Sequence, residues 1–114
     1  MLDTDRGLVV IAGCGHAGIV NTLEYARKRI GETPVFAALG AFHLLQADDR
    51  HLEWTGTTLR SFGTQHFLGA HCTGIEAVFR IREHAGLTRR TAVVGAVGAS
   101  FRLDRGIDPL SLAR

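Results

Sequence analysis

Short runs of apolar residues alternate with segments of helical periodicity along the first three quarters of the chain. Apolar runs at residues 8–12, 34–39 and 66–70 predict strands buried on both faces. Between and after them, apolar residues recur in steps of three and four, which predicts amphipathic helices over residues 17–30, 50–61 and 73–85. A glycine follows each predicted helix as a stop signal: Gly31, Gly63 and Gly86.

The ends of the third helix and the tail carry further signals. Thr73 and Glu76 have the spacing of a capping box at the start of the third helix. Residues 91–103 predict a fourth strand, which Gly95 and Gly98 interrupt, and residues 104–114 show little pattern beyond a final turn. The fourth strand completes a βαβαβαβ order.

This order predicts an α/β fold with a mainly parallel sheet and flanking helices joined by right-handed crossovers. The 114 residues are enough for one domain, and we expect residues 1–114 to form a single one. The chain opens directly on a buried strand, without elements that would cover such a sheet, so we expect this domain to be partial. In parallel sheets of this kind, ligands bind at the carboxyl ends of the strands.

Composition and charge indicate which classes of partner this protein binds. Hydrophobic residues make up 46% and charged residues 21% of the chain, which is typical of a globular protein with a packed core. The net charge of +2 is spread along the chain, so we expect no nucleic-acid partner. Every apolar run is far shorter than the roughly 20 residues that cross a bilayer, so we expect no membrane partner either.

The two cysteines do not make a secreted disulfide framework, and the first six residues contain acids where a signal peptide needs basic ones. These observations predict a reducing, cytoplasmic location.

A histidine follows each of the first three predicted strands: His16, His43 and His71. The intervals from 16 to 43 and from 43 to 71 are 27 and 28 positions, about the length of one βα unit. Parallel strands would therefore bring the three imidazoles to one edge of the sheet. Neutral imidazole binds zinc, iron or manganese and also transfers protons near neutral pH.

Other residues have less specific signals. Cys14 lies two positions before His16 and is a candidate metal ligand, whereas Cys72 is a weaker one; a buried cysteine is also a common apolar filler. Gly13 and Gly15 leave room for a ligand beside the backbone. We predict no role for the remaining histidines, His51, His66 and His84.

The segment from Gly13 to Gly18 is also a literal G-x-G-x-x-G between a strand and a helix, which is the dinucleotide-binding fingerprint. That fingerprint needs an acid near the end of the second strand, where this chain has Leu39, Gly40 and Ala41. A Rossmann-like nucleotide- or phosphate-binding domain is therefore the alternative, and a phosphate on the following helix N-terminus fits both hypotheses.

Three segments together resemble one branch of the metallo-β-lactamase superfamily, the branch that includes the dihydropterin ribofuranosylaminobenzene phosphate synthases. They are GLVVIAGCGHAGIVN from Gly7, GAFHL from Gly40 and AHCTG from Ala70. The resemblance covers nearly the whole chain but only the carboxyl-terminal half of such a protein, which implies part of an αββα sandwich. Gly15 replaces a common serine and Ala41 a usual glycine, and the amino-terminal His-x-His-x-Asp-His ligand motif is absent.

The resemblance implies roles for individual residues. His16 or the adjacent Cys14 falls at a ligand position of the second metal, and His71 corresponds to the late metal-binding histidine. His43 corresponds to a histidine near the substrate, and Gly13, Gly15 and Thr73 complete the predicted substrate-binding residues. The implied cofactor is a divalent metal: zinc, manganese, iron or magnesium.

The first hypothesis is therefore a metal-dependent hydrolase half that acts on a small, phosphate-bearing molecule and is catalytically incomplete alone. We expect its apolar inner face to be covered by a separate amino-terminal half or by a second copy in a homodimer. The alternatives are a non-catalytic homodimeric metal-binding domain and the Rossmann-like domain.

Overall fold

A computed structural model describes residues 1–109. Its strands are β1 (Leu2–Thr4), β2 (Gly7–Cys14), β3 (Val35–Ala41), β4 (His66–Ala70), β5 (Ala92–Gly95), β6 (Ser100–Arg102) and β7 (Gly106–Asp108). Its helices are α1 (Ile19–Ile30), α2 (Asp49–Ser61), α3 (Ile75–His84) and a 3₁₀ turn, η1 (His71–Thr73). None of the helices in this part of the chain is long and apolar enough to cross a bilayer.

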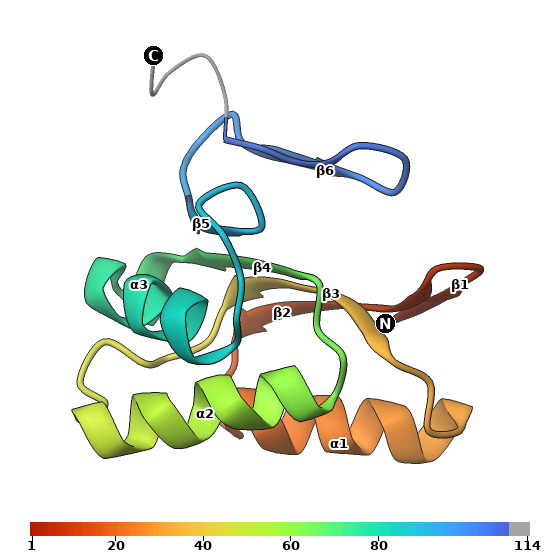
Figure 1. The fold of residues 1–114 in the computed structure, drawn as a ribbon, viewed down its shortest axis with the longest axis horizontal. Coiled ribbons are helices and arrows are strands. Elements are labelled where there is room, and N and C mark those ends of the chain that lie inside the picture. Colours follow the sequence, from red (N-terminus) through yellow and green to blue (C-terminus); the bar gives the residue numbers. More distant parts are fainter. Residues whose placement is uncertain (110–114) are drawn as a thin grey trace.

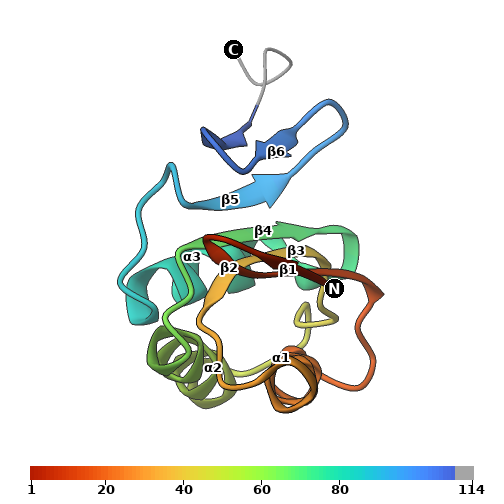
Figure 2. The ribbon, with the colours of Figure 1, turned by 90° about the vertical axis from the view of Figure 1, so that its right-hand side faces the viewer.

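The main sheet contains five strands in the order β1-β2-β3-β4-β5, and β2 to β5 run parallel to one another (Figure 1). The α/β fold with a mainly parallel sheet is thus confirmed. Because each right-handed crossover moves one strand in the same direction, successive helices are placed on the same face of the sheet. Figure 2 shows α1, α2 and α3 on one side, while β6 lies on the other.

The main core lies between the helices and the sheet. Leu8 and Val10 of β2 face the helices and are almost fully buried with Leu23 of α1 and Leu59 of α2. The opposite face carries a second, smaller apolar cluster built on Val9. This division follows from the alternation of side chains along a strand.

Several boundaries differ from the prediction. Residues 2–4 form an antiparallel edge strand, β1, that no pattern indicated. The predicted strand at 91–103 is two strands, β5 and β6, because Gly98 (φ 91°) lies in a turn between them. The segment predicted to have little pattern contains β7, which pairs with β6, and residues 110–114 lie outside the described residues.

Aromatic side chains attach the β6–β7 hairpin to the sheet. The His66 ring packs edge-on against Phe36, at 5.0 Å between centroids, and against Phe101 of β6, at 5.5 Å. Its Nδ1 atom is buried and has no hydrogen-bond partner among the described residues. Burial lowers the pKa of His66 from its ordinary value of 6.5.

We expect the stability of the fold to fall as the pH drops below 6.5, because the unfolded chain binds a proton on His66 more readily than the folded chain does. Above that value His66 is neutral in both states and the stability is fully present. Urea unfolding at pH 7.5 and 5.5 would measure the change. His66→Leu removes this titration, so a wild-type pH dependence in that variant would contradict the assignment; His84→Gln, in the last turn of α3, is the control.

Gly40 allows β2 and β3 to pair closely. Its φ is 129°, and a Cβ atom there would overlap the carbonyl oxygen of Ala12 on β2. Gly13 on the facing strand has open space around its Cβ position. We expect Gly40→Ala to lower the free energy of unfolding by about 2 kcal/mol or more and Gly13→Ala to change it by less than about 0.5 kcal/mol. Equal effects in chemical denaturation would show that the close approach at Gly40 is unimportant.

Candidate functional site

The register of the parallel strands brings three loops to one edge of the sheet. Cys14 pairs with Ala41, and Ala41 pairs with Ala70, so β2, β3 and β4 end at the same level. The residues that follow these strand ends form a rim, which contains His16, His43 and His71. The predicted placement at one edge therefore agrees with the strand register.

The rim histidines are divided between two groups. The rings of His16 and His43 are in contact, with 4.3 Å between their centroids; we call them the imidazole pair. His71 instead lies beside Cys14, with 3.8 Å from its Nδ1 to the Cys14 Sγ. Cys72 completes this second group, in which one ligand atom from each residue lies within 4.8 Å of the others; we call it the thiol cluster.

A β-bulge affects the position of Cys14. The pairing of β2 with β3 shifts between Ala12 and Cys14, so that Gly13 is an extra residue on β2. Such bulges redirect the side chains that follow them. Cys14 is exposed at the rim, and both it and Cys72 are free thiols.

The proximity of the two cysteines changes the acidity of Cys14. A hydrogen bond with Cys72 and repulsion between the two sulfur charges raise the pKa of the Cys14 thiol above its ordinary value. In the absence of a cation, the pair therefore resists a second negative charge. Two thiols and an imidazole form a donor set that suits zinc and iron.

Three hydrogen bonds join the rim loops to one another. The backbone N–H of Gly15 donates to the carbonyl of Ala41, at 2.9 Å. The N–H of Phe42 donates to the Thr73 hydroxyl, at 3.0 Å, and the N–H of Leu45 donates to the carbonyl of Cys72, also at 3.0 Å. These bonds hold the loops after β2, β3 and β4 in a fixed relation.

The prediction that Thr73 and Glu76 form a capping box is wrong. Gly74 occupies the cap position of α3, and no side chain caps it. Thr73 lies within η1, is fully buried and accepts a hydrogen bond from Phe42 instead. As a predicted substrate-binding residue, Thr73 is therefore placed beneath the rim, where its hydroxyl positions a loop.

Two rim histidines have an uncommon backbone conformation. His43 and His71 have φ values of 53° and 50°, and they are the only residues other than glycine with positive φ in the described chain. Such conformations disfavour a side chain with a Cβ atom and are concentrated at functional sites. The observation supports the choice of both residues from sequence.

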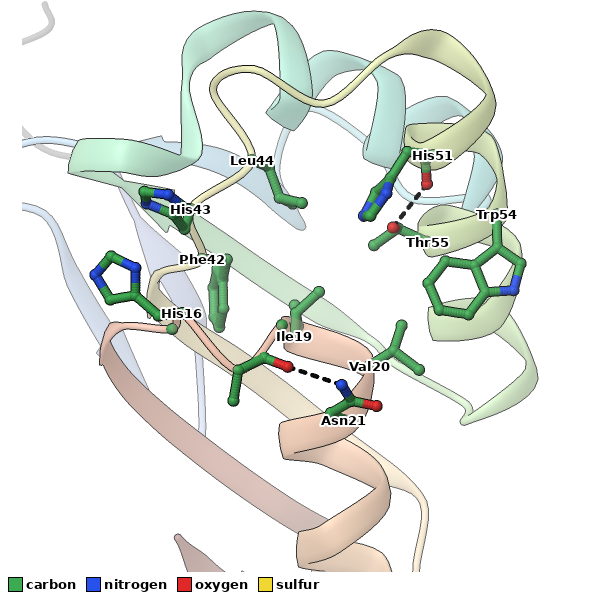
Figure 3. Close-up of a pocket in the computed structure, with 13 residues that line it drawn as sticks. His16, Ile19, Val20, Asn21, Phe42, His43, Leu44, His51, Trp54 and Thr55 are labelled. Atoms are coloured by element: carbon green, nitrogen blue, oxygen red, sulfur yellow. Dashed lines mark hydrogen bonds between the residues drawn. The ribbon is translucent and has the colours of Figure 1, made fainter.

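A cavity of about 360 Å³ lies between the rim and α2 (Figure 3). The imidazole pair borders one end, and His51 and Trp54 of α2 border the other. A second cavity, of about 310 Å³, is lined by His43, His51 and Cys72 among others, so it joins the two groups. The sequence prediction missed His51 and Trp54, although their separation by three positions places them on one face of a helix.

The glycines of the G-x-G-x-x-G segment have structural roles in this chain. Gly13 forms the bulge, Gly15 bonds to β3, and Gly18 caps α1 with φ 88°. A Rossmann-type sheet also reverses its strand order at a switch point, where the dinucleotide binds. The five-stranded sheet of this structure has a sequential order without such a reversal, so the topology argues against the Rossmann-like alternative.

Comparisons with known proteins agree with the geometry. A solved structure described as a metal-dependent hydrolase of the β-lactamase superfamily superposes with a TM-score of 0.68 and 32% identity, over 73% of this chain and 32% of that protein. The resemblance to the metallo-β-lactamase superfamily is confirmed. No protein-family model matches the chain.

Two curated proteins with sequences similar to this chain come from Methanocaldococcus jannaschii. A 7,8-dihydropterin-6-methyl-4-(β-D-ribofuranosyl)-aminobenzene-5′-phosphate synthase is 36% identical over 74 residues, which are 65% of this chain and 25% of that enzyme. An uncharacterized protein is 32% identical over 77 residues, 66% of this chain and 28% of that protein. The chain thus spans about a quarter of the length of the curated proteins that it matches.

We expect Thr73→Val to lower the free energy of unfolding by about 1–3 kcal/mol, because it leaves the buried N–H of Phe42 without an acceptor. Thr73→Ser keeps the hydroxyl and is the matched control. Urea denaturation measures both effects. If the serine variant lost as much stability as the valine variant, the hydrogen bond would not be the important contact.

Proposed function

We propose that this chain supplies part of the metal and substrate site of a metal-dependent hydrolase of the metallo-β-lactamase type. The single observation that supports it is the thiol cluster, in which Cys14 comes from one strand end and His71 and Cys72 from another. A metal site of this kind needs such convergence of donors from separate loops. The superposition on a metal-dependent hydrolase supports the same reaction class.

The donors present favour some of the expected metals over others. Thiolate and imidazole are ligands of zinc and iron, whereas magnesium and manganese prefer carboxylate and water oxygens. No carboxylate belongs to the thiol cluster as the described residues form it. We therefore infer that zinc or iron binds here, with Cys14, His71 and Cys72 as ligands. Such a metal supplies Lewis-acid polarisation of a phosphoryl or acyl oxygen.

The imidazole pair has a different task in this proposal. His16 and His43 are exposed, lie on the same rim and border the cavity between the rim and α2. Each imidazole can donate a hydrogen bond to an anionic substrate. We infer that His43 and His16 position the substrate, while Gly15 keeps the first loop against β3.

The proposal includes a partner. Three donors supply fewer ligands than two metals need, and the relatives are much longer than this chain. The face of the sheet opposite the helices also carries an apolar hollow of about 380 Å³ that Val9, Leu39 and Phe101 help to line. Ile11 there is 63% exposed. Covering this face with a further protein layer would contribute about 25 cal/mol per Å² of apolar surface removed from water.

The reaction and its location remain part of the same proposal. The substrate is a small molecule with a phosphate or acyl group, and two free cysteines at the rim suit a reducing compartment such as the cytoplasm. One of the curated relatives has the name of a synthase. We therefore include a transfer reaction on a phosphate-bearing substrate in the proposed function.

Metal binding tests the proposal directly. We expect the purified chain to bind one equivalent of Zn²⁺ and to give thiolate-to-metal charge-transfer absorption with Co²⁺. Cys14→Ser, Cys72→Ser and His71→Ala each remove one ligand and should weaken binding by about 100-fold or more. Isothermal titration and the absorption band measure these effects.

Two control variants sharpen the test. His84→Gln lies outside the rim and should bind metal as the wild type does. His16→Gln should also retain the metal, because the His16 ring contacts His43 and is not part of the thiol cluster. Wild-type affinity in the cysteine variants, or loss of metal only in His16→Gln, would overturn the proposed ligand set.

A further inference from the structure

The cavity between the rim and α2 has two chemically different ends. At the rim end lies the imidazole pair, and at the far end the indole of Trp54 lies with the His51 ring edge-on to it, at 5.8 Å between centroids (Figure 3). Between them, buried apolar side chains that include Ile19 and Phe42 line the cavity. The site is therefore apolar in the middle, aromatic at one end and rich in hydrogen-bond donors at the other.

The charge around the cavity favours an anion. Three imidazoles border it, and no acidic side chain does so among the described residues. The carboxylate of Asp48, which precedes α2, accepts the backbone N–H of His51 at 2.8 Å and thus caps the helix. The first turn of α1, which borders the same cavity, contains no acidic residue and has no side-chain cap. An oxyanion would gain hydrogen bonds here, whereas a cation would find no partner of opposite charge.

Trp54 indicates the other half of the ligand. Its side chain is 53% exposed although indole is one of the largest apolar groups in proteins. The cavity lies against it, so a planar ring entering from the rim would stack on the indole and cover it. Stacking of this kind adds about 0.5–1.5 kcal/mol beyond the burial of area.

We propose that this cavity binds an aromatic compound that carries an oxyanion, with the ring on Trp54 beside His51 and the oxyanion at His16 and His43. The inference rests on the proposed function only in taking this ligand as the substrate; the binding itself depends on the cavity alone. It assigns to α2, through His51 and Trp54, a share in selecting the substrate.

The chain has one tryptophan, so its fluorescence reports on the proposed site without a label. Phenyl phosphate is the probe, titrated in the presence of EDTA so that no metal attracts the phosphate. We expect saturable quenching or a spectral shift of Trp54. Inorganic phosphate, which lacks the ring, and benzyl alcohol, which lacks the charge, should bind at least about tenfold more weakly. Benzoate tests whether a carboxylate replaces the phosphate.

Variants locate the two halves of the ligand. His16→Gln and His43→Gln should each weaken phenyl phosphate binding by about tenfold, the equivalent of one hydrogen bond to a charged group. Trp54→Leu, followed by isothermal titration, should weaken phenyl phosphate but leave the weak binding of inorganic phosphate unchanged. Tyr25→Leu is the matched control, because Tyr25 is an exposed aromatic residue of α1 that does not line the cavity.

The outcomes separate this inference from the proposed metal site. Equal affinity for phenyl phosphate and inorganic phosphate, or unchanged binding in Trp54→Leu, would overturn the aromatic half. An absence of saturable binding at concentrations on the order of 10 mM would overturn the whole inference. Binding that persists in a Cys14→Ser, Cys72→Ser double variant supports the cavity even if the metal site fails. Metal binding without phenyl phosphate binding supports the proposed metal site and overturns the inference about the cavity.

Discussion

The in-register parallel pairing of β2, β3 and β4 determines the position of the candidate functional residues on the rim. Because the three strands end at the same level, side chains that are 57 positions apart in sequence, Cys14 and His71, come within contact distance. The pairing alone would still leave the loops free to move. Hydrogen bonds from loop to strand and from loop to loop, through Ala41 and Thr73, fix their relation. The rim therefore owes its shape to backbone pairing and not to packing of the functional side chains.

The sequential strand order has a second effect. Each crossover adds its helix to the same face, so one face of the sheet is well covered and the other, within residues 1–109, receives only the β6–β7 hairpin. Rossmann folds cover both faces by reversing direction part-way. The apolar hollow on that face is the observation behind the proposed partner. The thiol cluster lies at the edge of the same sheet and supplies three donors.

The central elements could be predicted because their patterns are strong. The strands β2 and β3 are apolar on both faces, and α1 and α2 have clear helical stripes. The short strands β1, β6 and β7 have three residues each, too few for a period to be visible, and their pairing depends on tertiary contacts. Gly98 was recognised as an interruption, but its positive φ turns the chain away from the sheet.

The candidate site was also predictable only in part. Strand-end position predicted which histidines reach the rim, since it depends only on topology. Which of them touch one another depends on loop conformation, and so His16 pairs with His43 while His71 joins the cysteines. Thr73 fitted a capping pattern, yet the preceding 3₁₀ turn directs its hydroxyl toward Phe42. Trp54 gave no sequence signal because an exposed aromatic residue on a helix becomes informative only when a cavity is found beside it.

The left-handed conformation at His43 and His71 links the chemistry of the rim to the stability of the whole protein. Glycine is the residue best suited to such a backbone, so replacing either histidine by glycine would relieve strain in the folded state while removing an imidazole. Random mutagenesis selected for heat resistance alone should thus enrich glycine at these two positions. Selection for the proposed function should retain histidine there, and the protein would remain less stable than its fold allows.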